Sequence, residues 1–562
     1  LLLLAQAVHA VRRFELTVGL QLLDPDCSGI QIATPVVNGQ YPGPALRVLE
    51  GEPIEVLVHN ALPNATTTIH FHGIGQNGSP EADGVPYFSQ QPIQPGGSFL
   101  HRFTVHHQVG TFFYHAHVGY QEESVQGPFI VHARNGRSLP GHYPYRRLEE
   151  YGVRYDAEEI LMLGEWWHQS QDVREDYLLG PNFVFDAGSD SVLMNGRTIY
   201  NETTASPTCQ YTSIHVQPNK KYRLRVIGGQ SFRFFGLRIL GHTMTIIEVD
   251  GEPVKPYETD FIEIATAQRF SVILDTHNYS AGSRFIMALE YRWRGQGPAY
   301  TENGYGYLEY DGDSDEDEDE DDEDAVVTNI SDRTALLPPI ASIPENIDWI
   351  WPNLESINPK AIHLHKQKSA DRTLILRAML YQTPQNTSRY LVNGRPPPDW
   401  SSMGMTLLEQ MEQVPVQREP EADGYDPQRM TYPIYAGEVV DLVFQNAIAA
   451  GDQCIAHPWH THGHSHVMVA TGAGDYIHEI HKDVITFTKP LYKDVSTIYP
   501  NVASNDSLGV YEGVGCGWTK VRILADNPGV WATHCHITSH MLQGKMAAIE
   551  ERPHSRHGRH GH

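Results

Sequence analysis

The chain has 562 residues, of which 40% are hydrophobic, with 48 Gly, 37 Pro and a formal charge of −27. At about 150 residues per domain, this length predicts three or four domains, each with a core of its own. The many Gly and Pro residues favour short strands over long helices. Because the sequence has no basic stripe, nucleic acid is excluded as an expected partner.

The first ten residues, LLLLAQAVHA, are typical of the end of a secretory signal, with small-residue spacing at Val8 and Ala10. No later stretch approaches the roughly 18 apolar residues of a membrane span. We therefore expect a soluble, secreted protein with no membrane partner. Seven Asn-x-Ser/Thr triplets agree with secretion; they begin at Asn64, Asn77, Asn201, Asn278, Asn329, Asn386 and Asn505.

Alternating hydrophobic segments such as FELTVGL, PIEVLVHN, KYRLRVI and RFSVIL are separated by Gly, Pro and Asn turns, a pattern typical of β-sandwiches and barrels. An Asn-Gly turn, a spacer and such a strand occur three times, beginning at VVNG, VLMNG and LVNG. The repetition predicts an all-β chain built from three copies of one Greek-key sandwich module. We place these modules at residues 11–140, 150–312 and 330–553.

Two polar segments are expected to lie outside the modules. The run DGDSDEDEDEDDED at 311–324 holds twelve acidic residues and cannot bury apolar surface. It predicts a disordered loop or linker over 313–329, with binding of calcium or a basic partner as the alternative. The final HSRHGRHGH, residues 554–562, predicts a disordered tail with adventitious metal binding as the alternative.

Histidines gather in four short motifs. Side chains at positions i and i+2 of a strand share a face, so each His-x-His pair can present two imidazoles to one place. One such pair is more often structural, but pairs in both the first and the last module indicate a metal cluster. The motifs are HFHG (His70, His72), HAH (His115, His117), HPWHTHG (His457, His460, His462) and HCHITSH (His534, His536, His540).

Cys535 lies between two of these histidines. In an extended segment its side chain faces away from both neighbours. It can therefore join His457 and His540 in a His₂Cys set, the ligand set of blue-copper sites, while His534 and His536 reach a cluster on the other side. A core cysteine and a zinc site are the alternatives. One thiolate among many imidazoles favours a redox metal, for which the peptide around Cys535 would be a short electron path.

The four motifs occur in the order found in the multicopper oxidases, and the chain resembles that family over nearly its whole length. VVNGQYPGPALRV, FHGIGQNGSPEADGVP, YHAHVGYQ and GEWWHQS are similar to stretches of its ascorbate oxidase and laccase-like branch. The resemblance implies three cupredoxin domains and four copper ions. It also implies one-electron oxidation of a reducing substrate, with four such steps reducing dioxygen to water.

The resemblance assigns each copper ligand to a residue of this chain. The type 1 copper takes His457, Cys535 and His540; the type 2 copper takes His70 and His460; the type 3 pair takes His72, His115 and His536 on one copper and His117, His462 and His534 on the other. No ligand is missing. The resemblance therefore favours an enzyme over the family's copper-free cell-wall relatives, which are structural or adhesion proteins.

Dioxygen reduction consumes protons, and Asp83 in EADGVP stands where the family keeps an acidic residue near the cluster. The alternative is an Asp-Gly turn. Some members of the family carry a second acid three residues after the cysteine, where this chain has Thr538. We expect His464 to form hydrogen bonds around the cluster rather than to bind metal.

Five cysteines are present, and once Cys535 is assigned to copper the other four can pair in a secreted protein. Cys27 and Cys209 match a family bridge between the first and second modules. Cys454 and Cys516 are left for each other by elimination, with a free surface thiol as the alternative.

The substrate is expected to deliver electrons at the edge of His540. GEWWHQS resembles an ascorbate oxidase stretch whose tryptophan stacks on the substrate ring, which makes Trp166 or Trp167 a candidate, with a core Trp pair as the alternative. Enediols such as ascorbate and electron-rich phenols both fit this expectation. A ferroxidase, the further alternative, would need carboxylates around His540.

The axial position of the family lies ten residues after the cysteine and holds Met, Leu or Phe, but here it is Lys545, followed by Met546. An ammonium has no lone pair for copper, and its burial beside a cationic metal is unfavourable. We favour a lysine that snorkels outward and leaves a three-coordinate site. The alternatives are ligation by the neutral amine and a one-residue bulge that brings Met546 to the axial place.

Overall fold

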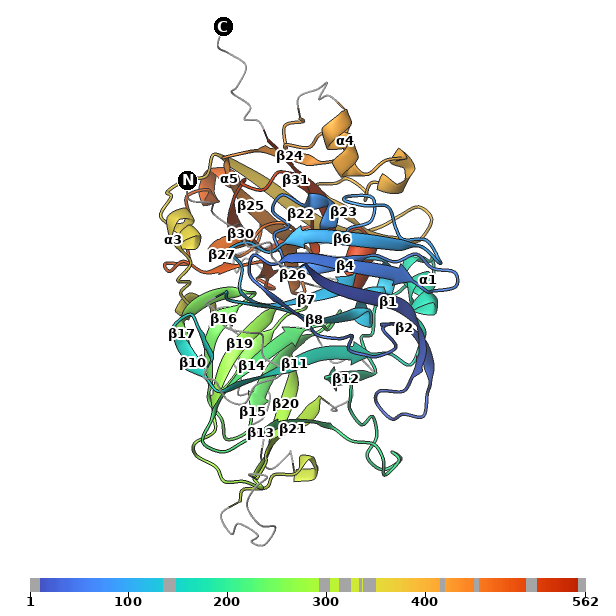
Figure 1. The fold of residues 1–562 in the computed structure, drawn as a ribbon. Coiled ribbons are helices and arrows are strands. Elements are labelled where there is room, and N and C mark those ends of the chain that lie inside the picture. The colour runs from blue at the N-terminus through green and yellow to red at the C-terminus, as the bar shows by residue number, and fades with distance from the viewer. Residues whose placement is uncertain are drawn as a thin grey trace, which may run out of the picture.

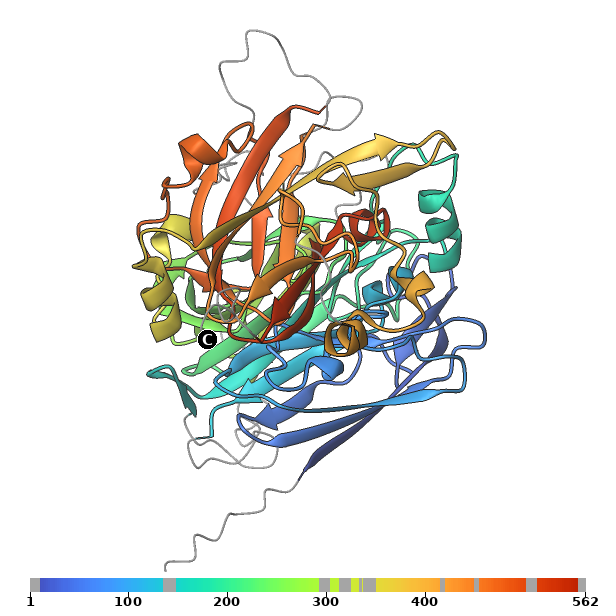
Figure 2. The ribbon, with the colours of Figure 1, turned by 90° about the horizontal axis from the view of Figure 1, so that it is seen from above.

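The computed structural model describes residues 11–134, 148–292, 304–312, 325–332, 336, 350–414, 420–448, 454–501 and 513–553. The expected signal remnant 1–10, residues 313–324 of the acidic run, Asn505 and the tail 554–562 lie outside this range. The fold is all-β, as predicted, and consists of three pairs of sheets that follow one another along the chain. In Figure 1 the second pair, in green, lies below the first and third, in blue and orange, and Figure 2 views these two from above.

The first pair of sheets has the strand orders β2-β1-β4-β6 and β3-β8-β7-β5. The strand bounds are β1 Arg12–Leu23, β2 Ile32–Val37, β3 Leu46–Leu49, β4 Pro53–Asn60, β5 Ile69–His72, β6 Ser98–Thr104, β7 Gly110–Ala116 and β8 Gln126–His132. A separate hairpin, β9 Leu148–Glu150 and β10 Val153–Tyr155, leads into the second pair of sheets.

The second pair of sheets has the orders β12-β11-β14-β19-β16-β17 and β13-β21-β20-β15-β18. The bounds are β11 Ala157–Trp166, β12 Ser191–Met194, β13 Thr212–Val216, β14 Lys221–Gly228, β15 Phe234–Ile239, β16 Met244–Val249, β17 Glu252–Thr259, β18 Ile262–Ile264, β19 Arg269–Asp275, β20 Arg284–Arg292 and β21 Tyr305–Tyr310. The last part of the expected linker, 325–329, runs along β20, since Val327 forms a bridge with Arg284.

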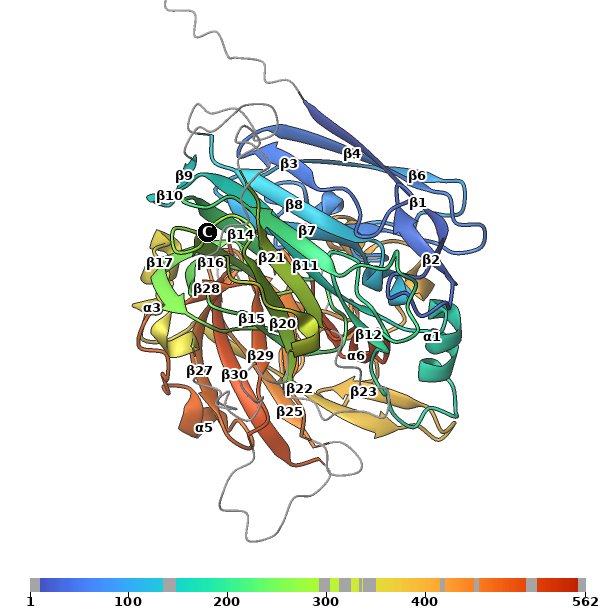
Figure 3. The ribbon, with the colours of Figure 1, turned by 90° about the horizontal axis from the view of Figure 1, so that it is seen from below.

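The third pair of sheets has the orders β23-β22-β25-β30-β27-β28 and β24-β32-β31-β26-β29. The bounds are β22 Arg372–Gln382, β23 Ser388–Val392, β24 Tyr432–Tyr435, β25 Val439–Ala447, β26 His457–Thr461, β27 His466–Gly472, β28 Tyr492–Lys493, β29 Val495–Ile498, β30 Gly515–Leu524, β31 Gly529–Cys535 and β32 Met546–Arg552. Figure 3, seen from below, shows the first sheet pair at one side of the view and this one at the other, with the second pair in front of them. The three domain boundaries expected from the sequence remain a prediction.

Helices are short and lie in the connections between strands. The α-helices are α1 Gln171–Leu179, α3 Pro359–His365, α4 Leu407–Gln413, α5 His478–His481 and α6 Thr538–Leu542. The 3₁₀ helices are η1 Pro80–Ala82, η2 Gly119–Glu123, η3 Ile330–Asp332, η5 Trp351–Asn353 and η6 Trp400–Met403. No helix among the described residues is both long and apolar enough to cross a membrane.

The Asn-Gly repeat reflects one turn used three times, after β2, β12 and β23. Asn38, Asn195 and Asn393 all have positive φ, as do the glycines that follow them. Each asparagine side chain accepts a hydrogen bond from a backbone N–H of the neighbouring strand, at 2.7, 2.7 and 2.9 Å. The amide thus ties the turn to β1, β11 or β22 in the same way, because asparagine tolerates this left-handed conformation.

The four strands of each sheet in the first domain match the first four strands of the corresponding sheets in the other two, so that β5, β15 and β26 are equivalent, as are β7, β20 and β31. Each of these pairs is antiparallel. In the first and third domains these strands carry the His motifs, whereas in the second they read FFGLRI and RFIMALEYR, without histidine. The apolar core of the second domain is continuous with that of the third, and the first domain has a core of its own.

Candidate metal centre

The histidine motifs lie on two strand pairs that face each other, one from the first domain and one from the third. The ring centroids of His70 and His462 are 3.9 Å apart, and those of His72 and His460 are 3.8 Å apart. Residues almost 400 positions apart in the chain therefore share one buried place. This placement is the one that the alternation of side chains along each strand predicts.

Among the described residues, five sets of three bring possible ligand atoms within 4.8 Å of one another, and all of their residues are buried. One of them contains a carboxylate and consists of His70, Asp83 and His462. The four ligand sets that consist only of expected ligands are His457, Cys535 and His540; His72, His115 and His536; His117, His462 and His534; and His70, His72 and His460. All eleven expected ligands occur in these sets. Three sets coincide with the division that the resemblance implies, and the fourth adds His72 to the expected pair His70 and His460.

The His457, Cys535 and His540 set is compact. The Nδ1 atoms of the two histidines are 3.0 Å apart, and the Cys535 Sγ lies 3.7 and 3.8 Å from them. Cys535 ends β31, and its N–H donates to the carbonyl of Lys545 at 3.0 Å. The side chains of His534 and His536 belong to the other sets, so Cys535 faces away from both neighbours, as its place in an extended strand predicts.

The rings of the other sets are oriented by backbone carbonyls. The Nδ1 atoms of four histidines lie within hydrogen-bond distance of carbonyl oxygens: His70 to Asp83 at 2.7 Å, His115 to Ala116 at 2.8 Å, His460 to Asp494 at 2.9 Å and His534 to Cys535 at 3.1 Å. A carbonyl oxygen can accept a hydrogen bond only from a nitrogen that carries a proton. The proton of each neutral ring is therefore on Nδ1, and Nε2 keeps a lone pair that can bind a metal.

Burial keeps seven of the imidazoles neutral. Desolvation lowers the pKa of His534 to about 4, and it lowers the pKa of His72, His115, His117, His460, His462 and His536 well below the usual 6.5. The Nε2 atoms of His70, His115 and His460 are buried without a hydrogen-bond partner among the described residues. Neutral, unpartnered imidazole nitrogens beside a His₂Cys set fit copper.

Asp83 is fully buried beside two candidate ligands. Its Oδ2 is 3.0 Å from His462 Nδ1, and its Oδ1 is 3.3 Å from His70 Nδ1. The Asp-Gly turn is also real, because Gly84 has φ +86° and a Cβ there would lie 1.9 Å from the Ile69 carbonyl. The turn thus delivers the carboxylate to the histidines, and the two interpretations of the sequence are compatible.

Glu122 is a neighbour of the centre that the sequence did not indicate. Its carboxyl, on η2 of the first domain, accepts a hydrogen bond from the Thr538 hydroxyl of the third. Its Oε2 lies 3.8 Å from His115 Nδ1. Desolvation raises the pKa of Glu122 to about 8. A buried carboxyl thus lies beside Thr538, the position where some family members carry their own acid.

Asp494 was also missed, because it lies 34 residues after His460 on a different strand connection. Its carboxylate Oδ1 is 3.5 Å from His72 Nε2, and its backbone carbonyl is the acceptor for His460. No spacing rule connects this residue to the histidine motifs. The only local signal is a carboxylate among the buried residues that precede β29.

Lys545 does not snorkel to water, since its side chain is only 1% exposed. Its Nζ donates to Asn446 Oδ1 at 2.9 Å and lies 4.8 Å above the centroid of the Tyr390 ring. Met546 packs with Val85 and other residues of a separate apolar cluster. The expectation that the lysine head reaches water is therefore wrong: an amide oxygen and an aromatic face hold the ammonium inside the protein.

Trp166 and Trp167 are both buried, with exposed fractions of 5% and 8%. Trp167 packs in one apolar cluster with Cys535 and Ile537. The Arg174 guanidinium lies 3.7 Å above its ring centroid and covers that face. This packing favours the core interpretation over stacking of a substrate ring on either tryptophan.

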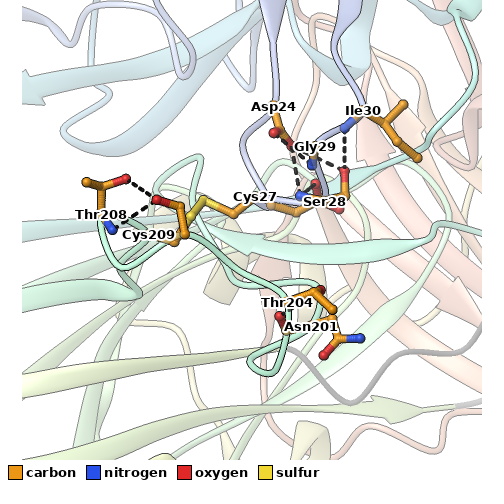
Figure 4. Close-up of a disulfide and its surroundings, with 11 residues drawn as sticks. Asp24, Cys27, Ser28, Gly29, Ile30, Asn201, Thr204, Thr208 and Cys209 are labelled. Carbon is orange, nitrogen blue, oxygen red and sulfur yellow. Dashed lines mark hydrogen bonds between the residues drawn. A yellow bond between two sulfur atoms is a disulfide. The ribbon is translucent and has the colours of Figure 1, made fainter.

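The expected bridge between Cys27 and Cys209 is confirmed, with an S–S distance of 2.05 Å (Figure 4), and it joins the first and second domains. The expected bridge between Cys454 and Cys516 is wrong in this structure. Both residues are free thiols in the structure, and the Cys454 thiol donates to the Cys516 carbonyl at 3.2 Å.

His464 contacts Glu551 Oε2 at 2.8 Å and the His462 carbonyl at 3.1 Å. It belongs to none of the four ligand sets. It therefore supports His462 from outside the centre, as its sequence position led us to expect.

Comparison with known proteins agrees with this geometry. Residues 23–136, 157–313 and 396–555 each match a multicopper oxidase domain family. The chain is 30% identical to the L-ascorbate oxidase of Nicotiana tabacum, over 92% of this chain and 86% of that protein. It is 28% identical to laccase-2 of Cryptococcus neoformans var. grubii, over 97% and 85% of the two chains.

The fold is similar to the crystal structure of Fet3p, a multicopper oxidase that functions in iron import. The TM-score is 0.72 at 23% identity, and the match covers 97% of this chain and 91% of that one. At this identity the likeness concerns the fold, which is that of three cupredoxin domains.

Proposed function

The chain belongs to the multicopper oxidase family, and on that premise we propose that it is a secreted oxidase that takes electrons one at a time from a small phenol or enediol and reduces dioxygen to water. The observation that carries the proposal is the arrangement of ten histidines and Cys535 in the four sets described above. A copper-free structural role finds no support in this arrangement, because every expected ligand is present and buried.

We assign the type 1 copper to His457, Cys535 and His540, and three further coppers to the remaining sets. Copper in these places would supply one-electron transfer from the reductant and the reduction of dioxygen. The chain itself provides the connection between the two regions, since the peptide neighbours of Cys535 are His534 and His536. An electron that arrives at the thiolate therefore has a covalent path to both.

Two buried carboxyls are placed to handle protons. Asp83 contacts the Nδ1 atoms of His462 and His70, and Glu122 lies on the His115 side. We propose that Asp83 supplies protons for the reduction of dioxygen. We also propose that Glu122 has the role of the second acid that some family members carry at the position of Thr538. Carboxyls in a site that excludes bulk water can supply protons in this way.

An organic reductant is favoured over ferrous iron by the charge near His540. The Tyr390 ring lies 5.2 Å from the His540 ring and carries the Lys545 ammonium on its face. A buried cation repels a divalent ion in low dielectric, whereas an electron-rich ring or an anionic enediol is not repelled.

Metal analysis and oxygen uptake test the proposal. We expect about four copper ions per chain, the number that the family resemblance implies, and faster turnover of ascorbate or a methoxyphenol than of ferrous iron. Zinc in place of copper, or copper without oxygen uptake, would contradict the proposed function. Preference for ferrous iron would contradict only the substrate class.

Secretion is supported by the disulfide between Cys27 and Cys209, because such bonds persist in oxidising compartments. Asn64, Asn201 and Asn386 are exposed sequon residues. Expression in a secreting host followed by glycopeptide mass spectrometry tests this part. Retention inside the cell, without glycans at these sites, would contradict it.

A further inference from the structure

The second domain contributes no candidate ligand, yet one of its side chains touches all three domains at the centre. Arg269 is the first residue of β19 and is fully buried. Its Nε donates to the Thr111 carbonyl on β7 of the first domain at 3.2 Å, and its Nη1 donates to the Ala267 carbonyl at 3.0 Å. Its Nη1 and Nη2 also donate to Oδ1 and Oδ2 of Asp494 in the third domain, at 2.7 and 2.6 Å.

Asp494 in turn contacts two candidate ligands, His460 and His72. Its backbone carbonyl lies 2.9 Å from His460 Nδ1, and its carboxylate lies 3.5 Å from His72 Nε2. The Nδ1 of His72 is 3.2 Å from His536 Nε2, so it faces the centre. The ion pair therefore lies directly behind rings from both facing strand pairs. Such outer partners fix the tautomer and the orientation of ligand rings.

The surroundings are shaped around this ion pair. Gly73, which follows His72, has φ +85°, and a Cβ there would lie 2.5 Å from both Arg269 Nη2 and Asp494 Oδ2. The Asp250 carboxylate links the backbones of the second and third domains beside this ion pair. It accepts hydrogen bonds from the N–H of Arg269 at 2.9 Å and from the N–H of Val495 at 3.3 Å. The ion pair between Arg269 and Asp494 therefore fits only because the residue after His72 is a glycine, which has no side chain to fill that space.

We propose that Arg269 is a positioning residue for the centre and that, through Asp494, it holds His72 and His460 in the geometry that retains copper. The inference rests on the proposed function, since it requires that these histidines bind metal. Without the guanidinium, Asp494 becomes a buried carboxylate without its cation, a state that is strongly unfavourable. Its side chain then rotates, and the carboxylate no longer lies behind the His72 ring.

The test compares Arg269→Lys with Arg522→Lys. Arg522 forms a buried two-point ion pair with Asp441, at 2.6 and 2.9 Å, on the outer sheet of the third domain, and it serves as the matched control. The measurements are the melting temperature of the copper-free protein, copper retained after dialysis against a graded chelator series, and the separate type 1 and type 2 signals in electron paramagnetic resonance.

We expect both variants to lower the melting temperature. Only Arg269→Lys should weaken retention of the non-type 1 coppers, by roughly 10- to 100-fold, while its blue absorption persists. Asp494→Asn should reproduce the selective loss, and the double variant should add nothing further. This second variant keeps the proposal testable if Arg269→Lys does not fold.

The inference is overturned if Arg269→Lys and Asp494→Asn retain copper as the wild type does, or if they lose type 1 and other copper in proportion, as a merely destabilised protein would. The wild-type protein separates this outcome from a failure of the proposed function. If it takes up no copper at all, the proposed function fails; if it is fully loaded and the variants match it, only the role of Arg269 fails.

Discussion

Replacing Lys545 with Leu is expected to lower the reduction potential of the type 1 copper and to leave its blue absorption intact. The ammonium is buried on Asn446 and on the face of Tyr390, and the Tyr390 ring contacts His540. A fixed positive charge at this place favours the reduced, less positive state of the metal. The variant removes that charge without offering copper a new ligand.

The structure sets the size of the effect. Nζ lies 4.8 Å from the Tyr390 centroid, which lies 5.2 Å from that of His540. The charge is thus within about 10 Å of the His540 ring, where one unit charge acts on another with about 1.7 kcal/mol at an effective dielectric constant of about 20. For one electron, this corresponds to a decrease of roughly 70 mV.

Redox titration of the blue band measures this shift, with Lys545→Arg as the control that keeps the charge. We expect the arginine variant to stay close to the wild type. An unchanged potential in Lys545→Leu would refute the electrostatic argument, because it would mean that the amine is neutral or screened. Loss of the blue band in Lys545→Leu would show instead that the amine is a copper ligand.

Three further outcomes are expected. Asp83→Asn should slow reoxidation by dioxygen about 100-fold or more while substrate still reduces the type 1 copper at nearly the wild-type rate; stopped-flow separates the two half-reactions, and equal slowing of both would contradict a proton role. Burial raises the pKa of Glu122 to about 8, so the folded copper-free protein holds a proton that the unfolded chain releases near its ordinary value. This contribution to stability is complete at low pH and is lost as pH rises toward 8. Glu122→Gln should therefore remove a slope of about 1.4 kcal/mol per pH unit between about pH 5 and pH 8, as measured by denaturant unfolding at several pH values; an unchanged slope would contradict it. Replacing Cys27 and Cys209 together with Ser opens a loop closed over 182 residues, which should lower the free energy of unfolding by roughly 2–5 kcal/mol; calorimetry showing no loss would mean that the domain contacts alone hold this region.

The grouping of the candidate ligands could be predicted because each motif is local. Two histidines two positions apart in a strand share a face whatever the rest of the chain does, and Cys535 must face the other way. The Asn-Gly turns were equally local, since Asn38, Asn195 and Asn393 each tie the turn to an adjacent strand. Motif and turn are therefore readable without the tertiary structure.

The groups around the ligands were not readable in this way. Glu122 meets Thr538 across 416 positions of the chain, and the face of Trp167 is covered by Arg174 of the following helix. Lys545 was expected to reach water because the sequence could not indicate that Asn446 would meet its ammonium. In each case the partner comes from a separate element, and only packing brings the two together.

The same distinction applies to the second domain. Its strands equivalent to β5 and β7 carry no histidine, so the histidine motifs indicate no part for it in the centre. Its buried side chains nevertheless surround Thr111 at the start of β7: the Thr111 N–H donates to Glu248 at 2.8 Å, its Oγ1 accepts from Arg225 at 2.9 Å, and its carbonyl accepts from Arg269. The same arginines form buried ion pairs, Arg225 with Glu158 and Arg269 with Asp494, and such pairs contribute little net stability, because desolvation offsets their attraction. Their more direct effect is to fix one arrangement of three domains, and β7 is the strand that carries His115 toward the centre. A domain without ligands can therefore set the geometry of a site that it does not bind.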